Sequence, residues 1–505
     1  MARYVKLIDP SRPILFPNNN FGRERFHAAT GMPAFTDIHA KHYPYAEDIE
    51  KYARDSTLSK PFLFTEYNHS LDVAFEGLED RWEIIERYDK LAGGHIWLWA
   101  DQGLYRDVRG KTLVDSYADI NALNGKDTAL SPDRRLNQDT IMDSHGQFGT
   151  DGIVYADRFP QEDYWETRKV YAPIKITEDS ALVNPGTNTL SLTVHNRYDF
   201  TDLKQIKAQW QLIEGTQVIQ EEALSLNAAP HQSTRLNPIL KMPTQLANLP
   251  YFLHLRFSDP SGLNVYEHSI RLVPSAGAVD YAALLGAPFP STHPEWPTGQ
   301  TLTTETRTLE NQAVTLNIAE SGLWQLQDRK NPELRLKGPY LRVSRPLTMA
   351  ELRNYDGPER QPWQPNLLEP KLVQSTQSTD GTLCLEYEYM RPQHPGQKVK
   401  ARFWLKPGPE WLDIHYELSP ENVQGYFPEL GISFVLPEAL NEFHWLGNGP
   451  YAAYPYRATL AGPGIHRVRV DEPYFRGNRS GVDWATLSDP RAMASASQAN
   501  RKMWQ

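Results

Sequence analysis

Glu66 is the residue of this sequence whose position points most directly to chemistry. It follows the apolar run Pro61–Thr65, which has the length and composition of a short buried strand. At the carboxyl end of a strand in a β/α barrel, acidic side chains converge on the substrate. Glu66 is therefore a candidate nucleophile. The alternative is an acid in a solvated loop, which position alone does not exclude.

Two tryptophans occur in the next predicted strand, Gly93–Trp99. Alternation along a strand places Trp97 and Trp99 on one side and Leu98 on the other. Trp97 is then a candidate for the mouth of a pocket, because an aromatic face suits the apolar C–H face of a sugar ring. Burial of both rings in the core is the other interpretation.

The elements that would position these residues can be predicted over residues 1–168. Apolar runs predict strands at 13–16, 35–38, 61–65 and 93–99, and helical periodicity predicts a helix over about 77–91. Residues 4–8 resemble the last turn of a helix. Strands that alternate with helices indicate β/α units around a parallel sheet. Four strands make half of an eight-stranded barrel, so this domain is expected to be incomplete.

Two further domains and a linker are predicted downstream. Short alternating strands over residues 172–275, separated by Asn, Gly and Pro, indicate an immunoglobulin-like β-sandwich. Residues 276–300 concentrate proline and small residues, which is typical of a linker. Residues 301–505 are again rich in strands and predict a larger β-sandwich. The predicted fold is therefore multidomain, with half a barrel followed by two sandwiches.

Composition excludes several classes of partner. With 505 residues, of which 40% are hydrophobic and 11% aromatic, the chain can bury several cores. The net charge of −10 is spread along the chain, and no Lys/Arg run suggests nucleic acid as a partner. Cys384 is the single cysteine, which excludes an internal disulfide, and we expect it to be buried in a strand. No apolar leader and no run of about 18 apolar residues occurs, which predicts a soluble chain, cytoplasmic as given, without a membrane partner.

Four different sequence motifs follow one another along most of the chain. They are Glu66-Tyr67-x-His69, Gly93-Gly94-x-Ile96-Trp97-x-Trp99-x-Asp101-Gln102, Phe148-x-x-x-Gly152-Ile153-Val154-x-Ala156-Asp157-Arg158, and Trp445-Leu446-Gly447-Asn448-Gly449-Pro450. In this order the motifs resemble glycoside hydrolase family 2, and most of all its large bacterial β-galactosidases. The last motif favours these enzymes, because the related β-glucuronidases and β-mannosidases lack the C-terminal sandwich. The resemblance implies the C-terminal half of a (β/α)8 barrel, an immunoglobulin-like sandwich and a galactose-mutarotase-like sandwich.

The resemblance also implies catalytic roles for two residues and sugar contacts for two more. Glu66 matches the nucleophile, which attacks the anomeric carbon and forms a covalent intermediate. Tyr43 matches a tyrosine that hydrogen-bonds the nucleophile and assists breakdown of that intermediate. His69 matches a histidine that binds sugar hydroxyls, and Trp97 matches the tryptophan at the base of the sugar subsite.

Three other positions complete the implied site. Phe148 matches an aromatic residue beside the aglycone site. Asp151 stands where β-galactosidases usually have an asparagine that contacts the sugar. Since a carboxylate accepts hydrogen bonds but cannot donate them as an amide does, specificity at this position is expected to differ. Asp101 is expected to form structural hydrogen bonds within the barrel.

The second carboxylate of the reaction is expected to be missing. Retaining glycosidases need two carboxylates about 5–5.5 Å apart. In this family the acid/base glutamate lies in an Asn-Glu pair upstream of a segment that matches Val5–Pro13 here. We therefore expect the acid/base, the first four barrel strands and the family's N-terminal domains to lie outside this chain. The family's magnesium and sodium ligands also lie mostly upstream, so no cofactor and no complete metal site is expected.

Functions of different classes remain open. The chain is either part of a retaining β-galactosidase that hydrolyses terminal non-reducing β-D-galactose residues, inactive alone, or a non-catalytic carbohydrate-binding or structural remnant. Another specificity of the family, that of a β-glucuronidase or β-mannosidase, is a third hypothesis. The expected partners are β-galactosides and a second chain that carries the other barrel half, because half a barrel exposes unpaired strand edges. The same edges predict homo-oligomers or aggregation.

Overall fold

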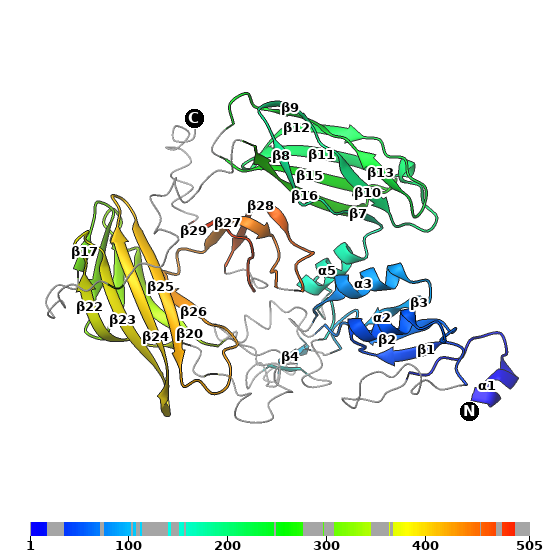
Figure 1. Cartoon of the computed structure of the whole chain (residues 1–505), viewed down its shortest axis with the longest axis horizontal. Helices are drawn as coiled ribbons and strands as arrows, with labels where there is room; N and C mark the ends of the chain where they lie inside the picture. Colours follow the sequence, from blue (N-terminus) through cyan, green and yellow to red (C-terminus); the bar gives the residue numbers. More distant parts are fainter. Residues whose placement is uncertain are drawn as a thin grey trace. The chain divides into compact units, whose positions relative to one another are not determined.

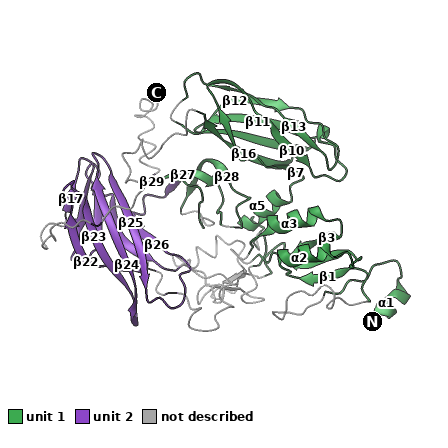
Figure 2. Cartoon of the chain, in the orientation of Figure 1, with its two compact units in different colours: residues 1–279, 348–350, 444–485 green, residues 280–347, 351–443, 486–505 purple. Residues whose placement is uncertain are grey.

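Figure 1 shows the computed structural model of the chain, which describes residues 2–17, 35–70, 75–102, 105–107, 112–113, 140–142, 151–155, 158–246, 249–275, 296, 308–344, 363, 367–454, 456–470 and 477–489. The chain forms two compact units (Figure 2). The first comprises residues 1–279, 348–350 and 444–485, and the second comprises residues 280–347, 351–443 and 486–505. Strands far outnumber helices among the described elements.

The first unit begins with a parallel sheet built from β/α units. Its strands lie in the order β1-β2-β3, and helices α2 and α3 connect them. Because both strand pairs are parallel, the three carboxyl ends lie at one edge of the sheet. A separate short sheet has the order β5-β4-β6. The bounds are α1 Ala2–Ile8, β1 His39–His42, α2 Ala46–Arg54, β2 Phe62–Tyr67, α3 Leu78–Arg87, β3 Leu91–Ile96, β4 Tyr105–Asp107, β5 Thr112–Leu113, β6 Thr140–Met142 and α5 Glu162–Val170.

Helix α2 shows why these segments fold as they do. Ile49, Tyr52 and Ala53 fall on one helical face and are buried. The ring of Tyr52 packs 4.5 Å from that of Phe62 on β2, measured between centroids. Acidic residues in the first turn and basic residues in the last turn complement the helix dipole. The apolar face therefore packs the helix against the sheet, and the charged residues at its ends stabilise the helix.

Two sheets around a shared core form the next part of the first unit. The sheets have the orders β13-β10-β7 and β12-β11-β15-β16-β8, and β14 pairs with β9. Alternate residues of β11, Ala208, Trp210 and Leu212, point into this core, as the period of a strand dictates. The bounds are β7 Ile174–Ile176, β8 Ser180–Val183, β9 Gly186–Thr189, β10 Leu192–Asn196, β11 Lys207–Glu214, β12 Gln217–Leu224, β13 Ser233–Leu236, β14 Ile239–Met242, β15 Tyr251–Ser258 and β16 Asn264–Pro274, with a 3-10 turn at Leu203–Gln205.

Residues 444–485 belong to the first unit, although they follow most of the second unit in the sequence. A three-stranded sheet of order β28-β27-β29 contains β27 Glu442–Gly449, β28 Gly462–Arg469 and β29 Trp484–Ser488. The buried indole N–H of Trp445 donates to the carbonyl of Asn448 at 2.9 Å, at the end of β27. This segment lies within the range 301–505 predicted for the C-terminal sandwich, and the contacts of residues 444–485 group them with the first unit.

The second unit is a sandwich of two sheets. One has the order β17-β18-β19-β20-β21, with β26 paired to β20, and the other has the order β22-β23-β24-β25. In its core the indole N–H of Trp324 donates to the hydroxyl of Tyr387 at 2.7 Å, and this hydroxyl donates to the carbonyl of Gly322 at 3.0 Å. Cys384 is buried in β23, as expected. The bounds are β17 Thr308–Glu310, β18 Val314–Ile318, β19 Trp324–Asp328, β20 Arg335–Arg342, β21 Leu367–Leu368, β22 Lys371–Gln377, β23 Leu383–Arg391, β24 His394–Pro407, β25 Leu412–Glu421 and β26 Gly431–Val435.

The strand-rich character predicted for residues 172–275 and 301–505 is confirmed where these residues are described, but three barrel strands differ from their predictions. The strand predicted at 35–38 lies at His39–His42, and the strand predicted at 13–16 reduces to one bridge between Leu15 and Ile38. The strand predicted at 93–99 lies at Leu91–Ile96, so Trp97 and Trp99 follow its end. Alternation therefore does not extend to the two tryptophans. Of the predicted linker at 276–300, only residue 296 is described.

No helix of the described residues is long and apolar enough to cross a membrane.

Candidate active site

Glu66 lies at the carboxyl end of β2, beside His42 at the end of β1. The two residues are register partners in the parallel ladder, after an irregularity that precedes His42. His42 Nε2 lies 3.4 Å from Glu66 Oε1, and the two side chains are only 15% and 20% exposed. His42 Nδ1 lies 2.6 Å from Thr65 Oγ1. An imidazole held on both sides can orient the carboxylate and donate a hydrogen bond to it.

Tyr43 follows the last residue of β1 and contacts the end of β2. Its φ of +46° lies in the left-handed region, which is uncommon for a residue other than glycine. Its backbone N–H donates to the carbonyl of Glu66 at 2.8 Å. Its ring stacks on that of His69, with centroids 5.8 Å apart and planes at 14°. Tyr43 therefore connects Glu66 to His69.

Asp151 is the centre of a second group of contacts. Its side chain is fully buried, and one oxygen, Oδ2, accepts hydrogen bonds from three ring or amide nitrogens. These are His69 Nε2 at 3.3 Å, Trp97 Nε1 at 3.0 Å and Gln102 Nε2 at 2.9 Å. Asp151 Oδ1 is buried and has no hydrogen-bond partner among the described residues. Such an atom is costly to bury, and a ligand hydroxyl could satisfy it.

Asp101 holds the backbone beside Asp151. Its Oδ1 accepts from the Gly152 N–H at 3.0 Å and from Gln161 Nε2 at 3.3 Å. Gln161 Nε2 also donates to the Gly152 carbonyl at 2.8 Å. A Cβ on Gly152 would lie 2.1 Å from the Asp101 backbone nitrogen, so only glycine fits this approach. These contacts agree with the structural role expected for Asp101.

The structure brings most of the predicted site residues together. Phe148 lies outside the described residues. Sequence reasoning missed His42 and Gln102. Only the strand register places His42 beside Glu66, and Gln102 belongs to a family motif in which no role was predicted for it. The predicted residues joined by the contacts above are Tyr43, Glu66, His69, Trp97 and Asp151.

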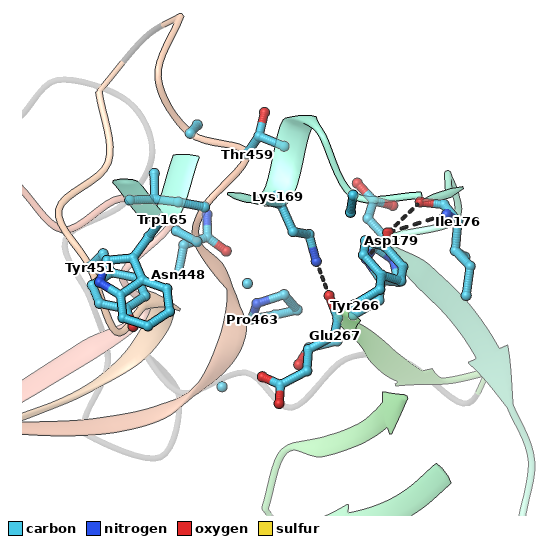
Figure 3. A pocket seen from close by; sticks show the side chains of 18 of the residues that line it. Trp165, Lys169, Ile176, Asp179, Tyr266, Glu267, Asn448, Tyr451, Thr459 and Pro463 are labelled. Carbon is cyan, nitrogen blue, oxygen red and sulfur yellow. Dashed lines mark hydrogen bonds between the residues drawn. The ribbon is translucent and has the colours of Figure 1, made fainter. Parts of the chain in front are cut away.

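A pocket of about 1190 Å³ lies elsewhere in the first unit (Figure 3). Residues of α5, β16 and the segment 448–466 contribute to its lining. Lys169 Nζ donates to the carbonyl of Glu267 and lies 4.3 Å from the centre of the Tyr266 ring. Burial lowers the pKa of Lys169 to about 8. None of the described residues predicted for the site lines this pocket, so it is separate from the Glu66 cluster.

Side chains that could bind a metal form no cluster in the part of the chain that the structure describes. No group of three or more His, Cys, Asp or Glu side chains there could hold a metal ion. The resemblance implies that the family's magnesium ligands lie mostly upstream of this chain.

Three family models match successive parts of the chain. "Glycosyl hydrolases family 2, TIM barrel domain" matches residues 1–176, "Beta-galactosidase, domain 4" matches residues 192–267, and "Beta galactosidase small chain" matches residues 308–505. A β-galactosidase of Priestia megaterium is 25% identical over 470 residues, which cover 90% of this chain and 42% of that protein. β-Galactosidase BgaC of Bifidobacterium adolescentis is 25% identical over 520 residues, which cover 97% of this chain and 45% of that protein.

A solved structure of Bacteroides uniformis β-glucuronidase 2 aligns with 97% of this chain and 49% of its own, at 13% identity and a TM-score of 0.27. The chain spans less than half the length of the curated relatives named above. The barrel part and the β-rich domains follow the order of the family models. The chain belongs to glycoside hydrolase family 2 and corresponds to the C-terminal portion of its β-galactosidases.

Proposed function

We propose that this chain provides the nucleophile and the sugar subsite of a retaining β-galactosidase, and that the acid/base comes from polypeptide outside these 505 residues. The observation that carries the proposal is the position of Glu66. Its carboxylate lies at the carboxyl edge of a parallel sheet beside His42. It is also connected through Tyr43 and His69 to the buried Asp151. Carboxylate and hydrogen-bonding groups thus meet at the edge where barrel enzymes bind substrate.

In the first step, a Glu66 oxygen attacks the anomeric carbon and forms an ester bond. The glycosidic C–O bond breaks, its electron pair goes to the leaving oxygen, and the acid/base supplies the proton. His42 keeps the carboxylate oriented, since it lies 3.4 Å from Oε1. Trp97 presents an aromatic face to the sugar.

In the second step, water attacks the same carbon and the ester bond to Glu66 breaks. The acid/base, now a carboxylate, takes the water proton, and the Glu66 carboxylate returns. The products are free galactose and the alcohol. Tyr43, held by its N–H to the Glu66 carbonyl, assists this step as the family resemblance implies.

Asp151 favours a neutral sugar over a uronic acid. A fully buried side chain with one oxygen lacking a donor calls for a hydroxyl, and the carboxylate of a glucuronide would meet like charge in a site of low dielectric. Parallel assays with nitrophenyl β-galactoside and nitrophenyl β-glucuronide therefore distinguish the two specificities, and faster glucuronide hydrolysis would contradict the proposal.

Covalent labelling tests the nucleophile without the acid/base. A dinitrophenyl 2-deoxy-2-fluoro-β-galactoside has a leaving group that needs no proton, and the fluorine slows release of the ester. We expect the chain to gain one fluorogalactosyl group, located on Glu66 by peptide mass mapping. The Glu66→Gln variant should remain unlabelled. Glu76→Gln, which changes an exposed glutamate nearby, should label normally. An unlabelled wild-type chain would contradict the proposal.

Leaving-group dependence tests the origin of the acid/base. Loss of a general acid typically costs about 10²–10⁴-fold in rate, and mostly for poor leaving groups. We expect the chain alone to release dinitrophenol from its β-galactoside far faster than it cleaves lactose. Comparable kcat/KM for the two substrates would mean that the acid/base lies in this chain.

Assembly and domain identity belong to the same proposal. We assign residues 172–275 to an immunoglobulin-like sandwich and residues 301–505 to a galactose-mutarotase-like one, in a cytoplasmic enzyme. The described part of the barrel sheet has three strands, and we expect its edges to pair with a second chain or a second copy. A monodisperse monomer in size-exclusion chromatography with light scattering would refute this expectation.

A further inference from the structure

Residues 456–460, here called the return loop, bind to helices α3 and α5 of the barrel part. The carbonyl of Tyr456 accepts from the Gly77 N–H at 2.7 Å, before α3. The N–H of Leu460 donates to Glu166 Oε2 on α5 at 2.8 Å. Close to the loop, Tyr451 stacks on Trp165 of α5 with ring centroids 5.0 Å apart (Figure 3). The return loop is therefore anchored to two helices.

Arg457 forms a buried ion pair between the return loop and α5. Its Nη1 lies 2.6 Å from Asp163 Oδ1, and the two side chains are 4% and 3% exposed. A buried ion pair of this kind depends on both partners, because removal of one leaves an uncompensated charge. The position of the Asp163 carboxylate is therefore set by Arg457.

The other oxygen of this carboxylate reaches the candidate active site. Asp163 Oδ2 lies 2.5 Å from Ser70 Oγ, which also lies 2.9 Å from the carbonyl of Gly152. A serine hydroxyl has one proton, and the shorter contact to a charged acceptor takes it. The Gly152 carbonyl keeps a donor in Gln161 Nε2 at 2.8 Å. Ser70 is thus held mainly by Asp163.

Ser70 is placed to position the sugar subsite. It follows His69 directly, and its N–H donates to the carbonyl of Trp97 at 2.8 Å. His69 and Trp97 are two of the three donors to Asp151. Any shift of Ser70 therefore moves both residues relative to the carboxylate they bind.

We propose that Arg457 is a positioning residue for the sugar subsite: through Asp163 and Ser70 it holds His69 and Trp97 in place around Asp151. The return loop then contributes to sugar recognition without touching the sugar. That these residues form a sugar subsite rests on the proposed function, whereas the chain of contacts from Arg457 to Ser70 does not.

Three substitutions separate positioning from simple attachment of the loop. Ser70→Ala removes the hydroxyl and leaves the Arg457–Asp163 pair intact. Arg457→Met breaks the pair, and Arg457→Lys keeps the charge for comparison. Thr459→Val is the matched control, because Thr459 Oγ1 donates to Glu79 on α3 and attaches the loop without reaching Ser70. Circular dichroism first establishes that each variant is folded.

The first readout is hydrogen exchange in peptides that contain the Ser70 and Leu98 amides, which donate to Trp97 and Asp151 respectively. We expect Ser70→Ala and Arg457→Met to accelerate exchange there by about tenfold or more, with partial recovery in Arg457→Lys and no change in Thr459→Val. If Arg457→Met accelerates exchange only in the return loop and α5, or if Ser70→Ala changes nothing, the pair serves attachment alone and the proposal is wrong.

The second readout is galactose affinity, followed by tryptophan fluorescence. We expect Ser70→Ala and Arg457→Met to weaken binding about tenfold, and Thr459→Val to bind as wild type does. Unaltered affinity in both site variants would overturn the proposal. If wild-type protein binds no galactose, the proposed function fails, and the exchange experiment still decides whether Arg457 positions His69 and Trp97.

Discussion

Replacement of Glu166 by glutamine tests how burial of one carboxyl group sets the pH dependence of the first unit. Glu166 is 1% exposed on α5 and accepts the Leu460 N–H. Burial raises its pKa from 4.5 to about 7. The carboxylates of Glu79 and Asp163 act in the same direction, whereas the hydrogen bond from Leu460 and the charge of Arg457 oppose it.

The folded protein therefore keeps a proton on Glu166 between pH 4.5 and about 7, where the unfolded chain has released it. The contribution of this group to stability is fully present below pH 4.5 and is lost as the pH rises to about 7. An increase of the pKa from 4.5 to about 7 corresponds to about 3 kcal/mol of unfolding free energy. Because the Glu166→Gln variant is uncharged at every pH, it should match wild type in acid and exceed it by about 3 kcal/mol near pH 8.

Hydrogen exchange measures this difference locally. Protection factors of amides in α5 and around Leu460, corrected for intrinsic exchange rates, should rise in the variant by about two orders of magnitude near pH 8 and by much less near pH 5. The control is Glu47→Gln, which changes an exposed glutamate on α2. A difference of the same size at both pH values, or a variant less protected than wild type at pH 8, would refute the reasoning.

Three other predictions concern packing. Gly152→Ala should destabilise the first unit by about 3 kcal/mol or more in urea unfolding, because its Cβ would lie 2.1 Å from the Asp101 backbone nitrogen. The Cβ of the control variant Gly396→Ala meets open space, so this variant should change stability little. Equal urea midpoints for the two variants would contradict the close approach at Gly152. Tyr387→Phe should cost about 1–3 kcal/mol in the second unit by leaving the Trp324 N–H without its acceptor, and an unchanged unfolding midpoint would argue against that contact. Cys384 should resist iodoacetamide in native protein and react after unfolding, because burial raises its pKa to about 11; rapid native labelling would show that it is accessible.

Much of the fold could be predicted because its strands bury alternate residues. β11 and β23 each show that period in their buried positions. β1 was harder to predict, since His39-Ala40-Lys41-His42 has no apolar alternation. Its burial comes from pairing with β2, which is a property of the sheet rather than of the segment.

Some residues of the candidate site could likewise be predicted from the sequence, and others could not. Glu66 could be proposed because it follows an apolar strand, and His69 and Trp97 because they stand in motifs. His42 becomes part of the site only through the strand register. The contact between Asp163 and Arg457 joins residues 294 positions apart, and no local pattern signals such a contact.

That separation also bears on how the protein is made. At about 5–20 residues per second, a ribosome needs roughly 15–60 s after synthesising Asp163 before it reaches Arg457. Most of the second unit is synthesised in that interval. Until then the Asp163 carboxylate has no guanidinium to compensate its charge, which opposes its burial beside Ser70. We therefore expect the contacts from Arg457 through Asp163 to Ser70 to form only after the return loop leaves the ribosome.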